Sequence, residues 1–135
     1  MKIVLDTNCL LPAIFSNSPY NWVWDFFCEG RFSLCCSTEI LNEYEELLSD
    51  FYSPEISESV MQTMMNATNI EQVIPYFKWR FISVDPDDNK FVDCALNAGA
   101  DYIVTNDKHF NVMKTVGFPP IKIINIETFR NLLLM

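Results

Sequence analysis

The chain has 135 residues, which suits one domain, and half of them are hydrophobic, so a core can form without disulfides. The formal net charge of −9 at pH 7 argues against a general nucleic-acid binder, because such proteins usually carry a basic patch. The excess of acids suits instead a site in which bound cations neutralise clustered carboxylates.

The cysteine pattern excludes two other classes of protein. The five cysteines are an odd number, they form no CxxC pair, and His109 is the single histidine that could join them. A disulfide framework or a Cys/His zinc site is therefore not expected, and the thiols are predicted to be reduced and mostly buried. The short apolar run after Met1 and Lys2 does not form a signal peptide, and no stretch approaches the roughly 20 apolar residues of a membrane span. We expect a cytoplasmic protein that does not contact a membrane.

Apolar runs of strand length alternate with longer helical patterns along the chain. Ser18-Pro19 and Ser53-Pro54 each combine a cap residue with proline at a helix start, and Gly30 and Gly99 fit helix ends. The expected strands are Ile3–Leu5, Phe32–Cys36, Phe81–Val84, Tyr102–Val104 and Ile121–Ile126. The expected helices are those from Pro19 to Gly30, Thr38–Asp50, Pro54 to about Ile74, Asp88–Ala98, His109–Thr115 and Thr128–Leu134. This alternation predicts one α/β domain over residues 1–135, a small doubly wound, mainly parallel five-stranded sheet flanked by helices.

Acidic residues follow three of the expected strands. Asp6 comes directly after the first strand, Asp85, Asp87 and Asp88 come after the third, and Thr105-Asn106-Asp107 comes after the fourth. Ligands of doubly wound sheets bind outside the carboxyl ends of the strands, so these acids are expected to share one edge. Carboxylates packed together repel one another unless cations are present.

Glu43 is expected to add a further acid from a helix that packs on the sheet. In the helix of residues 38–50 it lies at the margin of the apolar stripe, from which it can reach a shared site. Oxygen ligands with few histidines select Mg²⁺ or Mn²⁺, and such ions suit phosphodiester hydrolysis because they generate hydroxide and neutralise phosphate charge.

With these acids in these positions, the chain resembles the PIN domain family, and most of all the bacterial PIN proteins of toxin–antitoxin pairs. The resemblance covers essentially the whole chain. It rests on four stretches of sequence: Asp6-Thr7-Asn8, Glu43, the segment from Asp88 to Leu96, and the segment from Ala100 to Asp107.

The resemblance implies a Mg²⁺- or Mn²⁺-dependent endoribonuclease that acts on RNA. Position by position, the acidic quartet that would bind metal and catalyse is Asp6, Glu43, Asp88 and Asp107. Asn8 and Thr105 match polar positions that often line such sites, and Asp93 is a secondary candidate. The resemblance also implies an antitoxin protein as partner and homodimer formation, for which the aromatic and Met-rich first half offers a surface.

Ordinary structural roles compete with these assignments. Asp88 and Asp107 are also suited to capping the helices that follow them. Asp85 and Asp87 flank a proline and fit turn positions, and a lone histidine such as His109 is more often structural than catalytic.

Two other functions stay open at the level of sequence. A phosphatase of the haloacid dehalogenase type also has an Asp after its first strand, but the second acid usually found two residues later is Asn8 here. Turnover of a small phosphate ester without RNA cleavage would favour it. The other alternative is a non-catalytic PIN module that only binds a partner. Failure of the protein to bind Mn²⁺ would support this alternative.

Because the chain is acidic, binding of RNA phosphates would depend on cations near the acidic edge. The candidates are Lys78, Arg80, Lys90 and Lys108.

Overall fold

The computed structural model describes residues 1–74, 89–107, 110 and 121–135. The expected strand Phe81–Val84, the acids at positions 85, 87 and 88, and His109 lie outside the described residues, as does nearly all of the expected helix His109–Thr115. No helix in the described part is long and apolar enough to cross a membrane.

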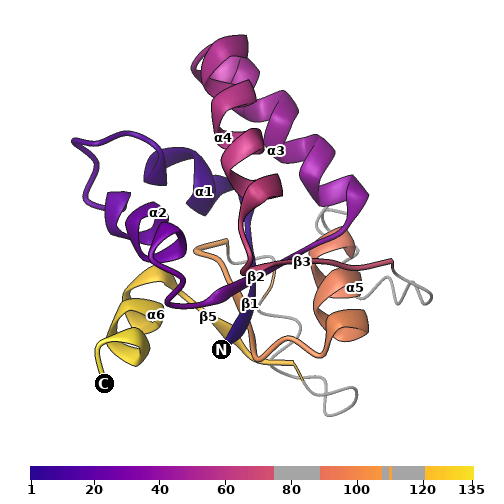
Figure 1. The fold of residues 1–135 in the computed structure, drawn as a ribbon. Coiled ribbons are helices and arrows are strands. Elements are labelled where there is room, and N and C mark those ends of the chain that lie inside the picture. Colours follow the sequence, from indigo (N-terminus) through magenta and orange to yellow (C-terminus); the bar gives the residue numbers. More distant parts are fainter. Residues whose placement is uncertain (75–88, 108–109, 111–120) are drawn as a thin grey trace.

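A five-stranded parallel sheet forms the centre of the molecule, with strand order β3-β2-β1-β4-β5. Figure 1 shows α2 and α6 on one side of this sheet and α5 on the other, with the hairpin of α3 and α4 above. The strands are β1 (Lys2–Leu5), β2 (Ser33–Cys36), β3 (Ile70–Gln72), β4 (Tyr102–Val104) and β5 (Ile123–Ile124). The helices are α1 (Thr7–Ala13), α2 (Asn21–Cys28), α3 (Thr38–Phe51), α4 (Pro54–Asn66), α5 (Asn89–Ala98) and α6 (Ile126–Leu133). The predicted α/β class and parallel five-stranded sheet are confirmed.

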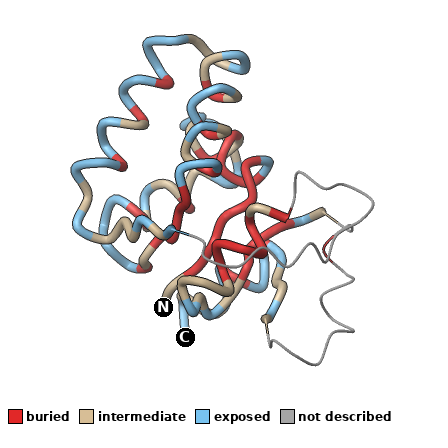
Figure 2. Tube along the Cα trace, turned by 90° about the vertical axis from the view of Figure 1, so that its right-hand side faces the viewer, coloured by how far each residue is buried: buried red, intermediate tan, exposed pale blue. Residues whose placement is uncertain are grey.

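The core follows the inner strands, which are buried on both faces (Figure 2). Ile3 and Val4 of β1 are fully buried, as expected for a central parallel strand between two helical layers. Beneath α2 and α6, Phe32 packs against Phe27 and Phe129 with ring centroids 6.0 and 5.0 Å apart. These aromatic contacts join the N-terminal and C-terminal parts of the chain.

Two expectations for the elements were wrong. The helix expected from Pro54 to about Ile74 ends at Asn66, and residues 70–72 form β3 instead. Asn69 explains the change, because its amide donates to the carbonyl oxygens of Phe27 and Phe32, both at 2.8 Å, and so leads the chain onto the edge of β2. The structure also contains α1, which had not been expected, since Pro12 stands inside it.

Candidate functional site

The site lies at the point where the order of the sheet reverses. From the central strand β1 the chain proceeds to β2 and β3 on one side, and β4 and β5 later fill the other side. Doubly wound sheets bind ligands at this switch point, outside the carboxyl ends of the strands. Asp6 follows β1 directly and Thr105 follows β4 directly, so these two residues meet there.

Asp6 is held in place from two directions. Its backbone is extended where the strand ends, and the residue is the N-cap of α1, with Oδ1 accepting from the Asn8 backbone N–H at 3.5 Å. Oδ2 accepts from Thr105 Oγ1 at 2.7 Å, and the same hydroxyl accepts from the Asp107 backbone N–H at 2.9 Å. Only 4% of Asp6 is exposed, so its carboxyl group is fixed in a buried position.

The surroundings of Asp6 oppose its negative charge. Burial raises the pKa of the Asp6 carboxyl, while the hydrogen bonds from Thr105 and Asn8 lower it. The charges of Asp107 and Glu43 raise this pKa further, which shows that both acids act on Asp6 across the site. A cation placed among these carboxylates would relieve the conflict.

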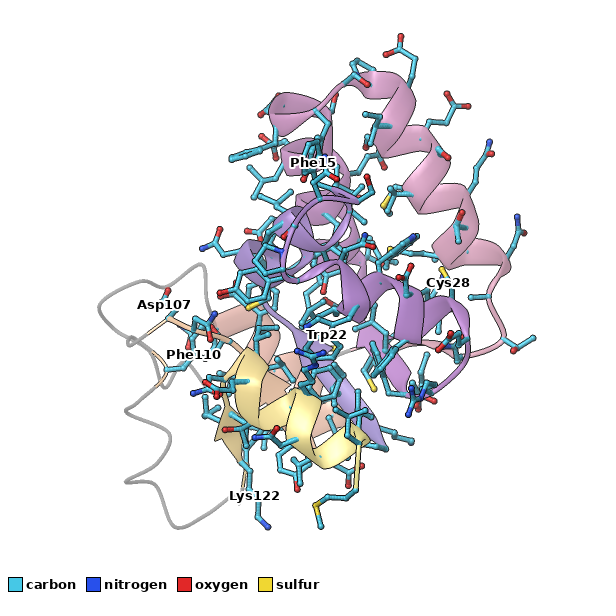
Figure 3. All side chains as sticks on the ribbon, turned by 90° about the vertical axis from the view of Figure 1, so that its left-hand side faces the viewer. Phe15, Trp22, Cys28, Asp107, Phe110 and Lys122 are labelled. Atoms are coloured by element: carbon cyan, nitrogen blue, oxygen red, sulfur yellow. The ribbon has the colours of Figure 1, made fainter. Side chains whose placement is uncertain are left out.

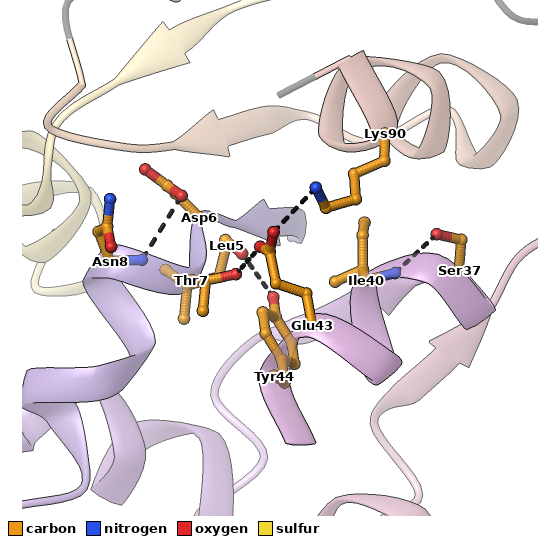
Figure 4. A network of polar contacts seen from close by, with 9 residues as sticks. All are labelled: Leu5, Asp6, Thr7, Asn8, Ser37, Ile40, Glu43, Tyr44 and Lys90. Atoms are coloured by element: carbon orange, nitrogen blue, oxygen red, sulfur yellow. Dashed lines mark hydrogen bonds and ion pairs between the residues drawn. The ribbon is translucent and has the colours of Figure 1, made fainter. Parts of the chain in front are cut away.

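Glu43 lies on α3 beside the start of α1, and both of its oxygens have partners (Figure 4). Thr7 Oγ1 donates to Oε2, and the Lys90 ammonium of α5 lies 2.8 Å from Oε1. The Tyr44 hydroxyl, which is fully buried, donates to the carbonyl oxygen of Leu5 and ties α3 to the end of β1. Glu43 is therefore held next to the Asp6 segment by contacts from three elements.

The structure brings some of the predicted residues together and separates others. Asp6, Glu43, Thr105 and Asp107 converge at the switch point. Asn8 contributes its backbone N–H, while the residue is otherwise exposed. Asp93 is buried on α5, whereas the acids that raise the pKa of Asp6 are Asp107 and Glu43. The fourth acid of the predicted quartet, Asp88, lies outside the described residues.

Within the part of the chain that the structure describes, no three His, Cys, Asp or Glu side chains are placed so that they could hold a metal ion. Among these acids, Glu43 forms an ion pair with the Lys90 ammonium. The donor chemistry nevertheless fits a hard divalent cation, because two further carboxylates act on Asp6 and a threonine hydroxyl donates to it.

The thiols do not offer an alternative nucleophile. Burial raises the pKa of Cys9, beside Asp6, to about 12, that of Cys94 to about 12 and that of Cys35 to about 11. Cys36 is also buried, Cys28 is exposed, and all five thiols are free, as the sequence predicted. Thiols with such high pKa values stay protonated and unreactive at neutral pH.

Two contacts at the site were missed from the sequence. Thr7 was not singled out, although a helix that begins directly after Asp6 would have placed its hydroxyl beside the site. Lys90 was one of four candidate cations for phosphate contacts, and its ion pair with Glu43 was not expected. No local sequence signal indicates this pair, because the two residues lie on different helices.

Comparison with known proteins identifies the family and the fold of the chain. A family model described as PIN domain matches residues 2–109. No curated protein matches the chain. Among solved structures, the crystal structure of VapBC2 from Rickettsia felis bound to a DNA fragment from their promoter contains a chain of the same fold. That chain matches with a TM-score of 0.63 and 18% identity, over 93% of this chain and 98% of the other.

Proposed function

This chain belongs to the PIN domain family, and we propose that it is a Mg²⁺- or Mn²⁺-dependent endoribonuclease that hydrolyses RNA phosphodiester bonds. PIN domains are generally nucleases. The observation that carries the proposal is the buried Asp6, fixed by hydrogen bonds while two further acids act on its charge. A bound cation would offset the repulsion among these carboxylates and favour their charged forms.

Asp6, Glu43 and Asp107, together with Asp88, would hold the metal in this proposal. When bound, a divalent ion would supply an activated water and neutralise charge on the scissile phosphate. Thr105 orients Asp6 through its hydroxyl and fixes the Asp107 backbone, so one residue aligns two acids. Thr7 orients Glu43 in a similar way, through the hydrogen bond that its hydroxyl donates to the carboxylate.

Lys90 has two states in this proposal. Without metal it compensates the charge of Glu43. With metal bound, its ammonium would contact a phosphate of the RNA at the acidic edge. This second role matters because the chain has a net charge of −9, and contacts of cations with phosphates supply much of the affinity for nucleic acid.

The cellular role is proposed from the PIN resemblance and the VapBC2 likeness. In this view the protein is the toxin of a cytoplasmic toxin–antitoxin pair, in which the antitoxin protein covers the acidic edge. We also propose a homodimer, which size-exclusion chromatography with light scattering would test. Co-purification of the protein with the product of a neighbouring gene would test the antitoxin.

The nuclease proposal is tested by incubating labelled single-stranded RNA with pure protein in Mn²⁺, in Mg²⁺ and in EDTA. Cleavage is expected with metal and not with EDTA. Asp6→Asn and Asp107→Asn should each lower the rate at least about 100-fold, because each removes a charge from the metal site. Asp25→Asn is the matched control, since Asp25 is an exposed residue on α2 away from the site and its loss should leave the rate unchanged.

Equal cleavage by wild type and the site variants would indicate a contaminating nuclease and refute the assignment of the site. A folded protein that neither cleaves RNA nor binds Mn²⁺ would favour the non-catalytic PIN module. Hydrolysis of a chromogenic phosphate ester without RNA cleavage would favour the phosphatase.

A further inference from the structure

A pocket of about 380 Å³ opens beside the acidic site, between the start of α2 and the start of α6. Its volume falls in the range of small-ligand sites. Asn106 lines the pocket and stands between Thr105 and Asp107, so an occupant of the pocket contacts the same segment that carries the site. The inference below rests on the proposed function, because it concerns the RNA that the site would cut.

Two aromatic rings and a guanidinium group line the pocket. Trp22 is oriented by Phe26 and Phe129, with ring centroids 5.4 and 5.8 Å away, and it also lines the pocket. The Arg130 guanidinium carbon lies 5.8 Å from the centre of the Trp22 ring, and the exposed Tyr20 also lines the pocket. Figure 3 shows Trp22 on the same face of the molecule as Asp107. Aromatic rings and guanidinium planes are the surfaces on which unpaired RNA bases stack.

The side-chain amides of Asn106 and Asn125 also line the pocket. Asn106 Oδ1 accepts from the Ile126 backbone N–H at 3.3 Å, and Asn125 Oδ1 accepts from the Thr128 backbone N–H at 2.8 Å. These bonds fix which way each amide points and leave its NH₂ group as a donor. Among the residues that the structure describes, neither NH₂ group has an acceptor. Amide donors at such positions can read the edge of a base.

The charges of the pocket favour a neutral occupant over a phosphate. Glu127 and Arg130 both line the pocket and carry opposite charges, so the pocket has no net positive charge to hold a phosphate. A base offers ring faces for Trp22 and Tyr20 and acceptors for the amides, and its charge does not conflict with Glu127. We propose that this pocket receives one unpaired nucleobase of the RNA strand next to the phosphodiester bond at the acidic site. A base that is stacked and paired in a duplex cannot enter the pocket, so binding there requires an unpaired base.

The test is the binding of a fluorescent single-stranded oligoribonucleotide, measured by anisotropy in EDTA so that no cleavage occurs. The same strand with abasic riboses and an RNA duplex serve as comparisons. Wild type is expected to bind the intact strand roughly 5- to 150-fold more tightly than the abasic strand, the range that one stacked base contributes. The double variant Tyr20→Ala/Arg130→Ala should lose most of this difference. Both residues are exposed, so the variant should keep the wild-type Tm and circular dichroism.

Arg31→Ala is the matched control. Arg31 also lies over an aromatic ring, 4.0 Å from the centre of Phe26, but it does not line the pocket, so this variant should keep the wild-type preference. Equal affinity of wild type for intact and abasic strands, or for single strand and duplex, would overturn the inference. So would a double variant that keeps the full preference. Because binding is measured in EDTA, these outcomes do not depend on metal-dependent cleavage, which tests the nuclease proposal separately.

Discussion

Two hydroxyl groups orient the acids of the site, and each comes from a residue at the end of a strand or the start of a helix. Thr105, after β4, donates to Asp6, and Thr7, at the start of α1, donates to Glu43. A carboxylate that accepts a hydrogen bond keeps its orientation even where burial disfavours its charge. Such residues are therefore expected to control both the stability and the activity of the site.

Thr105→Val should destabilise the protein, because valine keeps the shape of threonine but removes the donor to the buried Asp6. The loss of a hydrogen bond to a charged, buried group predicts about 2 kcal/mol less free energy of unfolding, measured by urea denaturation. RNA cleavage should fall roughly 10- to 100-fold, since the residue supports a metal ligand. Thr105→Ser keeps the hydroxyl and should stay within about 1 kcal/mol of wild type. If both variants behave alike, the hydroxyl has no special role.

Asp6→Asn should stabilise the metal-free protein at neutral pH. The pKa of Asp6 is raised in the folded state, so at a pH between the ordinary Asp value and the raised value the folded chain keeps a proton that the unfolded chain has lost. The free energy of unfolding therefore falls as pH rises through this window, and the penalty persists above it. Asparagine carries no charge and avoids the penalty. In EDTA, the Tm of the variant should exceed that of wild type at pH 7, and the difference should shrink as pH is lowered toward 4.

Lys90→Met should tighten Mn²⁺ binding while weakening the metal-free fold. The Lys90 ammonium compensates Glu43 at 2.8 Å, and a metal must compete with it for the same oxygen. The lysine and glutamate side chains are 12% and 26% exposed, so the pair is worth about 1 kcal/mol, which corresponds to roughly fivefold in Kd. Calorimetric titration of Mn²⁺ into both proteins would measure the change. An unchanged or weaker affinity would show that Lys90 does not compete with the metal.

At the scale of elements, hydrophobic patterns and end signals placed most helices and strands correctly. Ser53-Pro54 marks the start of α4, where the Ser53 side chain accepts from the Ile56 backbone N–H, and Gly99 marks the end of α5. The short elements α1 and β3 could not be predicted in this way. The proline at position 12 is unfavourable inside a helix, so the sequence does not indicate α1. The strand β3 depends on the side chain of Asn69, which donates hydrogen bonds to carbonyl groups about 40 residues earlier in the chain.

Gly99 should be replaceable only at a cost. Its φ of +65° ends α5, and the Ala100 N–H donates to the Ala95 carbonyl oxygen at 2.9 Å across that turn. A Cβ at Gly99 would meet no atom within 4 Å, so the cost of Gly99→Ala is conformational alone and should be about 1 kcal/mol in urea denaturation. Gly30, with φ of +75° and equally open space, offers an internal comparison and should lose a similar amount. A smaller loss for Gly99→Asn is expected, because asparagine tolerates this conformation better.

At the scale of the whole molecule, the sequence led to the fold and to the edge of the sheet that carries the acids. The strand-end positions of Asp6 and Asp107 were enough to place them together, because parallel strands end at one edge. Contacts between helices distant in sequence were not predictable, and the ion pair of Lys90 with Glu43 is the clearest case. The sequence shows the excess of acidic residues. It does not show that burial and neighbouring charges raise the pKa of one carboxyl group, that of Asp6.

The proposed metal site predicts that the stability of the protein depends on divalent metal. Free Mn²⁺ at 100 times its Kd should add about 2.7 kcal/mol to the free energy of unfolding, if the ion binds only the folded state. For a chain of this length the gain corresponds to a rise in Tm of roughly 10 °C, measured by differential scanning calorimetry against an EDTA sample. Asp25→Asn should keep this rise, whereas Asp6→Asn should lose most of it. Calcium chloride and sodium chloride at equal ionic strength are the control salts. General screening of the −9 charge would raise the Tm of wild type, Asp25→Asn and Asp6→Asn alike, whereas specific Mn²⁺ binding would not. An equal response of Asp6→Asn and wild type to Mn²⁺ would place the ion elsewhere and remove the basis for a metal site at the switch point.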